Sequence, residues 1–438
     1  MPLAIISLGI LLLFFLIIIF RLNAFIAFIV VSLSVGIAQG MELNSIVTSI
    51  EEGVGNTIGF LIIILALGAM LGKQVANSGA AQKITEKLIE ICGVKNTQWA
   101  VMITGFIVGV TMFYSVGFVI LVPLVFNIAI ITRLPLLYIG LPMLAALSVT
   151  HGYLPPHPAP SALTIMFEAD MGKTLLYGLA VAIPAILISG PMLTHFIKKV
   201  DAKPLKEFLA TKQFKKEELP SLSNSLLTAL FPVLLIGGST IILEFISEQN
   251  NLYSFIKFIG NPVIALLIAV LVSIYSLGLS RGEKMKDIMQ SFAKSISGIT
   301  MILLIIAGAG ALKQILIDSG VSDYIGTLLD GSQISPLILA WLIATVIRVC
   351  VGSATVAGLT AAGIVLPLIS NSDVSPELMV LAIGSGSLML SHVNDAGFWM
   401  FKEYFNLTIK ETLSTWTVME TIVGVTGLIG VLILNIFI

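Results

Sequence analysis

The sequence predicts an all-α polytopic membrane protein built from two inverted repeats, and three observations lead to this fold class. Of the 438 residues, 57% are hydrophobic and 11% are charged, whereas soluble domains carry about 25% charged residues. Apolar windows of about 20 residues, long enough to cross a bilayer as a helix, recur along the chain. The same order of apolar and polar segments also occurs twice. Each repeat is expected to hold about five transmembrane helices, a re-entrant hairpin and a broken helix.

Composition excludes several other classes of protein. The formal net charge is −1, so nothing indicates a surface for nucleic acid. Two cysteines, Cys92 and Cys350, are too few for a disulfide framework or a zinc site, and we expect no cofactor and no metal. The apolar start, residues 2–20, lacks the basic residues and the cleavage site of a signal peptide. It is therefore expected to be the first span of a multi-pass protein of the cell (inner) membrane.

The charged residues separate the apolar stretches and orient them. Lys and Arg gather on the cytoplasmic side of membrane proteins. The polar stretch 198–224 has seven lysines against four acids, whereas 41–56 has three glutamates and no basic residue. One membrane topology, in which the spans alternate in direction, places 19 of the 23 Lys and Arg in the cytoplasm and both termini outside. The spans expected from it are 2–20, 22–39, 58–72, 134–150, 174–197, 225–244, 262–280, 298–311, 378–391 and 417–438.

Two apolar stretches, 99–132 and 336–370, do not fit as single spans, because each begins and ends on the same face. Each has a centre of small and polar residues, GVTMFYSVG at 109–117 and VGSATVAG at 351–358. Irregular backbone at membrane depth is tolerated only inside protein or beside a water-filled cavity. We therefore expect two re-entrant hairpins. Two full spans joined by a tight turn remain the alternative for each.

An internal repeat relates the halves 1–219 and 220–438. GAMLGKQVANSG (68–79) aligns with AGALKQILIDSG (309–320), and the same offset pairs His151 with His392. An odd number of spans in each half requires the second copy to be inverted. Inverted repeats with broken helices are typical of secondary transporters, which bind substrate near the membrane midplane where the repeats meet.

A broken helix is expected in each repeat, near 151–161 and near 391–397. The first stretch reads HGYLPPHPAPS, and proline removes a backbone donor and blocks the helical ladder. The second begins SHVND, with four polar side chains in an otherwise apolar span. Backbone groups freed at such breaks can bind a substrate or an ion. An intramembrane enzyme is disfavoured, because no HExxH metal motif is present, and paired broken repeats favour alternating access over a channel.

Charged residues deep in a membrane are costly and usually mark a pathway or a coupling site. Asp395, with His392 or His151, is the expected site for a coupling proton, since imidazoles titrate near neutral pH. A purely structural Arg348–Asp395 ion pair is the alternative, as is close helix packing for the hairpin hydroxyls. Glu420 is interpreted as a boundary residue. The residues expected to bind substrate are Arg348, Ser353, Thr355, Asn394, Ser115, Thr111 and His157.

Five motifs, in this order, together resemble the gluconate permease family of gluconate:proton symporters: LGAMLGK, VGFVILVPLVF, PPHPAPSA, RVCVGSATVA and SHVNDAGFW. The resemblance implies uptake of a sugar acid or a related small hydroxy acid, proton coupling, and a homodimer with elevator-like motion. Two departures stand out. The chain has Ser115 where the family often has an acid in the first hairpin, and Ala159 where glycine is common.

The sequence thus predicts a secondary active importer of a small hydroxy-carboxylate, gluconate or a related sugar acid, by proton symport. The expected partners are this substrate, the proton, the lipid bilayer and a second copy of the chain. The alternative keeps the architecture but carries D-serine, glycerate or another small carboxylate, possibly with sodium in place of the proton. A carbonyl-rich helix break can coordinate sodium, and Ser115 in place of an acid leaves room for that ion.

Overall fold

The computed structural model describes residues 2–197, 200, 202, 214–320, 335–369 and 374–438. These residues form helices and turns, with no strand among them. Eight helices in the described part of the chain are long and apolar enough to cross a membrane, and several shorter apolar helices accompany them. The prediction of an all-α polytopic protein is confirmed.

The first half contains nine α-helices within the described residues. They are α1 (Pro2–Phe14), α2 (Ala24–Ala38), α3 (Leu43–Asn77), α4 (Ala80–Cys92), α5 (Thr97–Thr111), α6 (Tyr114–Thr132), α7 (Leu136–Tyr153), α8 (Pro158–Met166) and α9 (Met171–Leu187). Pro155 and Pro156 follow the end of α7. Helix α8 starts at Pro158, where the backbone N–H that proline lacks would have no partner within the helix. Asp170 begins α9 by accepting a hydrogen bond from the Lys173 amide at 2.7 Å.

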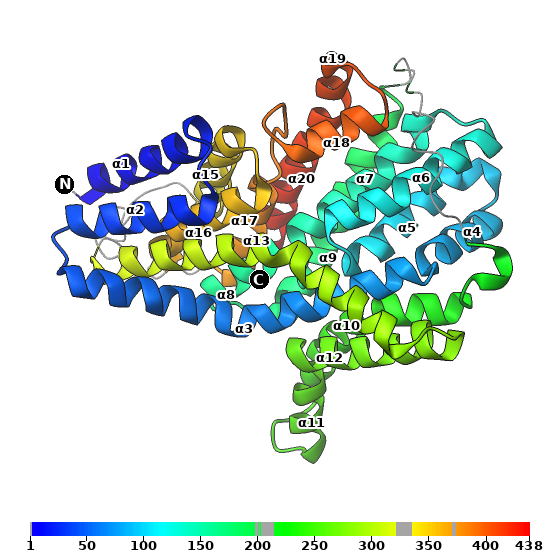
Figure 1. The fold of residues 1–438 in the computed structure, drawn as a ribbon, viewed down its shortest axis with the longest axis horizontal. Coiled ribbons are helices and arrows are strands. Elements are labelled where there is room, and N and C mark those ends of the chain that lie inside the picture. The colour runs from blue at the N-terminus through cyan, green and yellow to red at the C-terminus, as the bar shows by residue number, and fades with distance from the viewer. Residues whose placement is uncertain (1, 198–199, 201, 203–213, 321–334, 370–373) are drawn as a thin grey trace.

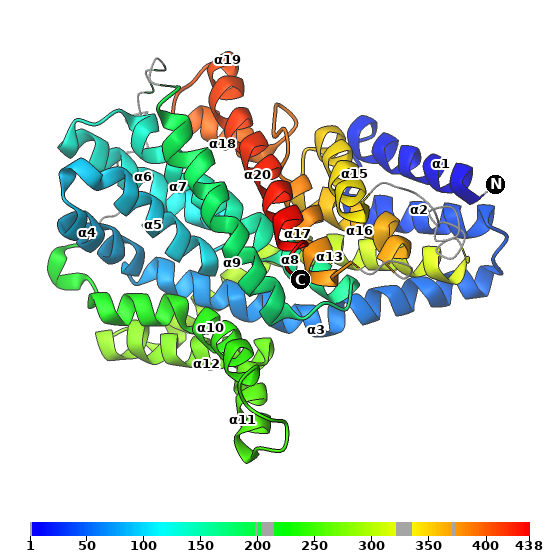
Figure 2. The same cartoon turned by 180° about the vertical axis from the view of Figure 1, so that it is seen from behind.

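The second half contains ten α-helices within the described residues. Its helices are α10 (Leu222–Leu243), α11 (Asn251–Gly260), α12 (Pro262–Ser273), α13 (Met285–Asp318), α15 (Pro336–Val351), α16 (Ala354–Ile369), α17 (Pro376–Gly386), α18 (Ala396–Tyr404), α19 (Ile409–Thr412) and α20 (Val418–Leu434). Helix α11 projects from the body below α10 and α12 (Figures 1 and 2). The inversion of the second copy, and the division at residue 219, stay predictions.

Helices α3 and α13 are much longer than the spans 58–72 and 298–311 expected for them. They contain 35 and 34 residues, or about 50 Å each at 1.5 Å per residue. The polar stretch 41–56 is helical from Leu43 onward. The sequence suggested a loop there because the glutamates mark the end of the apolar run, not the end of the helix.

Close packing between α3 and α13 explains their length. A Cβ added to Gly53 would lie 2.5 Å from the Gly310 carbonyl oxygen, so only glycine allows this approach. Ser49 donates to Asp318 (Oγ to Oδ2, 2.6 Å) at one end of the pair, and Asn77 donates to Ser291 (Nδ2 to Oγ, 2.8 Å) at the other. The two antiparallel helices run side by side in Figures 1 and 2.

The expected hairpins correspond to α5–α6 and α15–α16. Their turns lie at residues 112–113 and 352–353. Helices α5, α15 and α16 have 15, 16 and 16 residues, fewer than the roughly 20 needed to cross a bilayer. Helix α6, with 19 residues, is long enough by itself. The re-entrant course of the hairpins therefore stays a prediction, and the alternative of full spans stays open.

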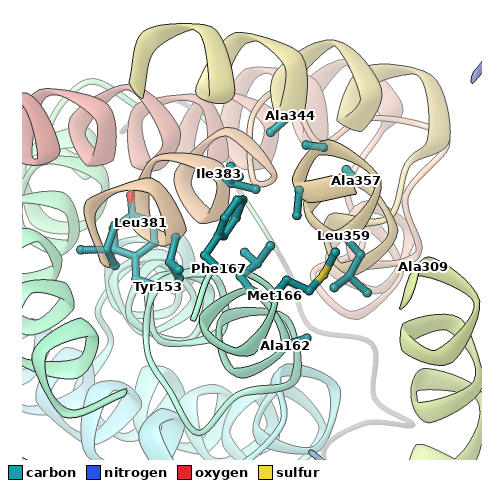
Figure 3. Packing of buried hydrophobic residues seen from close by; sticks show 14 of the residues in the cluster. Tyr153, Ala162, Met166, Phe167, Ala309, Ala344, Ala357, Leu359, Leu381 and Ile383 are labelled. Atoms are coloured by element: carbon teal, nitrogen blue, oxygen red, sulfur yellow. The ribbon is translucent and has the colours of Figure 1, made fainter. Parts of the chain in front are cut away.

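An apolar core connects the first break to the second half. Figure 3 shows Tyr153, Met166 and Phe167, from α7, α8 and the residue after α8, packed against Leu359 of α16 and Ile383 of α17. All five are buried. Tyr153 also donates its hydroxyl to the Val423 carbonyl of α20. These contacts hold the end of α7 against the helices of the second half.

Candidate functional site

A cavity of about 470 Å³ lies where the two hairpin turns meet the ends of α7 and α18, within the usual range for small-molecule sites. Its wall includes residues of α20 as well. A second cavity of about 200 Å³ shares Phe113, Ser115 and Ile302 with the first and is lined by Lys73 and Lys294. The larger cavity contains the charged groups of interest and is the candidate site.

Arg348, near the end of α15, is the cation of this cavity. Its side chain is 3% exposed, and Nη2 donates to Asp395. The guanidinium nitrogens Nε and Nη1 are buried without a hydrogen-bond partner. A buried guanidinium with unused donors is unusual, because leaving such groups unsatisfied is costly. Arg348 is therefore able to bind an anionic group that enters the cavity.

Asp395 uses both of its carboxylate oxygens within the protein. Besides Arg348, it accepts a hydrogen bond from the Ser391 hydroxyl. Its Oδ1 accepts from the Gly397 amide at 2.9 Å and caps the N-terminus of α18. Trp416 of the neighbouring segment donates to Ser391 (Nε1 to Oγ, 2.8 Å). This network fixes the carboxylate and, through it, the guanidinium.

The second break also holds the end of α15. Asn394 donates from Nδ2 to the Val349 carbonyl at 2.8 Å, and His392 Nε2 lies 3.0 Å from the same oxygen. Gly352 follows with φ of 76°, and a Cβ there would lie 2.2 Å from the Asn394 carbonyl oxygen. The backbone of the second hairpin turn thus touches the backbone of the second break, as only glycine permits.

The first half contributes neutral groups to the cavity. The Tyr114 hydroxyl and His151 Nδ1 are buried without a partner, and both residues line the cavity. Their rings lie 6.0 Å apart, and the Tyr114 ring is also 6.0 Å from Trp416. His157 lies behind His151, at 5.6 Å between ring centroids, with Nε2 2.6 Å from the Gly109 carbonyl oxygen.

Glu420 of α20 is a second cavity acid, and the interpretation of it as a boundary residue is wrong. It is 2% exposed and lines the cavity. Ser148 of α7 donates to it, at 2.6 Å from Oγ to Oε1. The signal was present in the sequence, since an acid inside an apolar span marks a functional position, but the nearby end of the span masked it.

Seven of the ten residues expected at the site line this cavity: Ser115, His151, Arg348, Ser353, Thr355, Asn394 and Asp395. Thr111 instead donates to the Val108 carbonyl of its own helix at 3.0 Å. His157 and His392 bond to backbone carbonyls, as described above, and do not line the cavity. Their roles in binding and coupling stay predictions. Within the described residues, no cluster of three or more His, Cys, Asp or Glu could hold a metal ion.

Curated relatives resemble the chain over its whole length. A high-affinity gluconate transporter of Escherichia coli K12 is 52% identical over 99% of both chains. An L-idonate transporter of the same strain and a gluconate permease of Bacillus subtilis 168 are each 48% identical, again over 99% of both chains. All three are named as transporters or permeases, not as enzymes.

Solved structures show the same fold at low sequence identity. The YdaH transporter of Alcanivorax borkumensis has a TM-score of 0.65 at 16% identity, covering 94% of this chain and 97% of its own. Neisseria gonorrhoeae MtrF has a TM-score of 0.66 at 15% identity, covering 94% of each chain. Residues 1–437 match the profile of the GntP family permeases. The chain therefore belongs to the GntP permease family and is a multi-pass membrane transporter.

Proposed function

We propose that this permease imports gluconate or a closely related sugar acid together with a proton. The single observation that carries the substrate class is Arg348, a buried guanidinium with two unpartnered nitrogens in the wall of the cavity. Relatives named for gluconate and for L-idonate, at 52% and 48% identity, support a sugar acid. Both ligands combine one carboxylate with a polyhydroxylated chain.

Arg348 suits the carboxylate. Its Asp395 partner compensates its charge but occupies only Nη2, and Nε and Nη1 remain as donors. Hydrogen bonds between ionised groups are about twice as strong as neutral ones. Removing one partner of such a buried pair costs about 2–5 kcal/mol. A neutral polyol offers these donors only uncharged hydroxyl acceptors, which bind them more weakly than a carboxylate does, so the site favours a sugar acid over a sugar alcohol.

The rest of the cavity suits the hydroxyl groups. Tyr114 and His151 present unpartnered polar atoms, and Ser115, Ser353, Thr355 and Asn394 lie on the same wall. A site built to hydrogen-bond a hydroxyl rejects an analogue that lacks it, because its own buried groups are then left unpaired. L-idonate, which differs from gluconate only in the arrangement of its hydroxyls, is the second candidate.

Proton coupling and movement complete the proposal. The cavity offers two acids for the proton, Asp395 and Glu420, and the sequence favours Asp395 with His392 or His151. Substrate and proton together would shift the population of outward- and inward-open states. A homodimer with elevator-like motion is proposed from the family resemblance alone.

Uptake of radiolabelled gluconate into proteoliposomes under an inward proton gradient tests the proposal. We expect accumulation that collapses with an uncoupler and that L-idonate inhibits, whereas sorbitol does not. Replacing sodium with choline should leave the uptake unchanged. Accumulation of D-serine or glycerate without gluconate would contradict the substrate, and accumulation driven only by sodium would contradict the coupling ion.

A further inference from the structure

The two acids of the cavity differ in how completely the protein satisfies them. Asp395 accepts hydrogen bonds from Arg348, from the Ser391 hydroxyl and from the Gly397 amide. Glu420 accepts from one hydroxyl, that of Ser148, and no ion pair in the described part of the chain includes it. A cation and two other donors therefore surround the Asp395 carboxyl group. Glu420 is buried with a single hydrogen bond to its carboxyl group among the described residues.

The groups around Glu420 do not supply a cation for it alone. The titratable and charged side chains that share its cavity are His151 of α7, Tyr114 of α6, Arg348 of α15 and Asp395 before α18. Arg348 is already paired with Asp395. Tyr153, also on α7, donates to the Val423 carbonyl. An ionised carboxylate buried in this way is costly, and a bound proton removes the charge.

The balance of charge links the proton to the substrate. With Arg348 and Asp395 cancelling each other, an ionised Glu420 leaves the cavity negative and repels an anionic sugar acid. A proton on Glu420 removes that repulsion, so each ligand raises the affinity for the other, as linkage requires. Asp395 cannot take up the proton in the same way, because protonating it would break the ion pair that positions Arg348.

We propose that Glu420 takes up the coupled proton and that Asp395 is a positioning residue that holds Arg348; this rests on the proposed symport of proton and sugar acid. On the outer side, one Glu420 oxygen accepts a proton from water as gluconate binds to Arg348. On the inner side, the carboxylic acid returns the proton to water as gluconate leaves. One anion and one proton cross together, so no net charge moves.

The test compares two kinds of transport by the Glu420→Gln variant in proteoliposomes. With the membrane potential clamped, an inward gradient of about one pH unit should drive about tenfold accumulation by the wild type with one proton per substrate. Glutamine keeps the shape and a hydrogen-bonding group but cannot exchange a proton. We expect its accumulation ratio to fall to about one. Its gluconate counterflow, which requires no net proton movement, should stay within about threefold of the wild type.

Glu377→Gln is the matched control. Glu377 also accepts a hydrogen bond from a serine (Ser375 Oγ to Oε2, 2.5 Å), but it lies at the start of α17, outside the cavity. Its accumulation ratio should be that of the wild type. Asp395→Asn should require more gluconate for half-maximal transport and yet still accumulate it under the gradient, as a positioning role predicts.

Different results separate the failure of this inference from that of the proposed function. If the wild type is proton-coupled and Glu420→Gln accumulates gluconate just as well, the inference is overturned and the proposed symport stands. An uncoupled wild type would overturn both. If Glu420→Gln loses counterflow as well, the Ser148→Ala variant tests the inference instead. Removing the hydroxyl that stabilises the Glu420 carboxylate should shift the pH dependence of uptake to higher pH. An unchanged pH profile would overturn the inference.

Discussion

The two helix breaks, one in each half of the chain, differ in chemistry. The first, between α7 and α8, is buried: His157 is 3% exposed and bonds to the Gly109 carbonyl. The second, between α17 and α18, is partly exposed to the cavity and contains Asp395, which is paired with Arg348. One break is closed by an imidazole against backbone, the other by an ion pair and its hydrogen bonds.

This difference indicates a division of labour. The first break stabilises the fold and offers neutral hydrogen-bonding groups, chiefly His151. Under the proposed function, the second break and the hairpin it touches supply the charge that recognises an anion. Changes to the polar side chains of the two breaks should therefore separate into effects on stability and effects on binding, whereas changes to the glycines test how tightly the backbone is packed there.

The largest expected effect is on substrate affinity in the second half. Arg348→Gln should raise the Kd for gluconate at least about 30-fold, since losing one member of a buried charge pair costs about 2–5 kcal/mol. His151→Gln, at the first break, should raise it at most about tenfold, the scale of one neutral hydrogen bond. Binding measurements on purified protein by calorimetry give both values.

Two controls make the comparison of Arg348 with His151 specific. Arg281→Gln removes an arginine that bonds to the Ser78 carbonyl at 2.6 Å outside the cavity, and gluconate affinity should not change. Arg348→Gln alone leaves the Asp395 carboxylate without its cation, and the double variant Arg348→Gln/Asp395→Asn removes that unpaired carboxylate. Equal losses of affinity in His151→Gln and Arg348→Gln would contradict the division of labour.

The next effect concerns the glycines where hairpin and break meet. Gly352→Ala places a Cβ 2.2 Å from the Asn394 carbonyl oxygen, and a non-glycine residue at positive φ costs about 1–2 kcal/mol in addition. In the first half, a Cβ on Gly109 meets the Thr150 Oγ1 at 2.5 Å, a side-chain atom. Gly352→Ala should therefore lower folded yield and transport more than Gly109→Ala, as measured by size-exclusion profile and uptake.

A smaller effect separates two histidines. His157→Ala removes the group that satisfies the buried Gly109 carbonyl, which costs about 1–3 kcal/mol, and the Tm should fall by several degrees. His392→Ala should lower the Tm less, because Asn394 also donates to the Val349 carbonyl. Thermal unfolding in detergent measures both. A larger fall for His392→Ala would mean that the second break, too, is chiefly structural.

Local sequence signals predicted an all-helical chain and both hairpin turns, and most of the residues they pointed to as a site line the cavity. Prolines mark the first break at residues 151–161, and a centre of small residues marks the second hairpin turn at 351–358. Arg348 and Asp395 stand out because they are charged in apolar surroundings. The full length of α3 was not predictable from hydropathy, since its polar first turns are held by packing on α13 at Gly53 and Gly310. Glu420 was missed because it lies near the expected end of its span, and because its hydrogen bond to Ser148 joins positions 272 residues apart in the chain.

A structure of the protein with gluconate bound in a lipid nanodisc tests the central claim most directly. We predict the gluconate carboxylate within about 3 Å of Arg348 Nε or Nη1, with the hydroxyl chain toward Tyr114 and His151. A carboxylate bound instead between Lys73 and Lys294 in the smaller cavity, or the hydroxyl end at Arg348, would contradict the account.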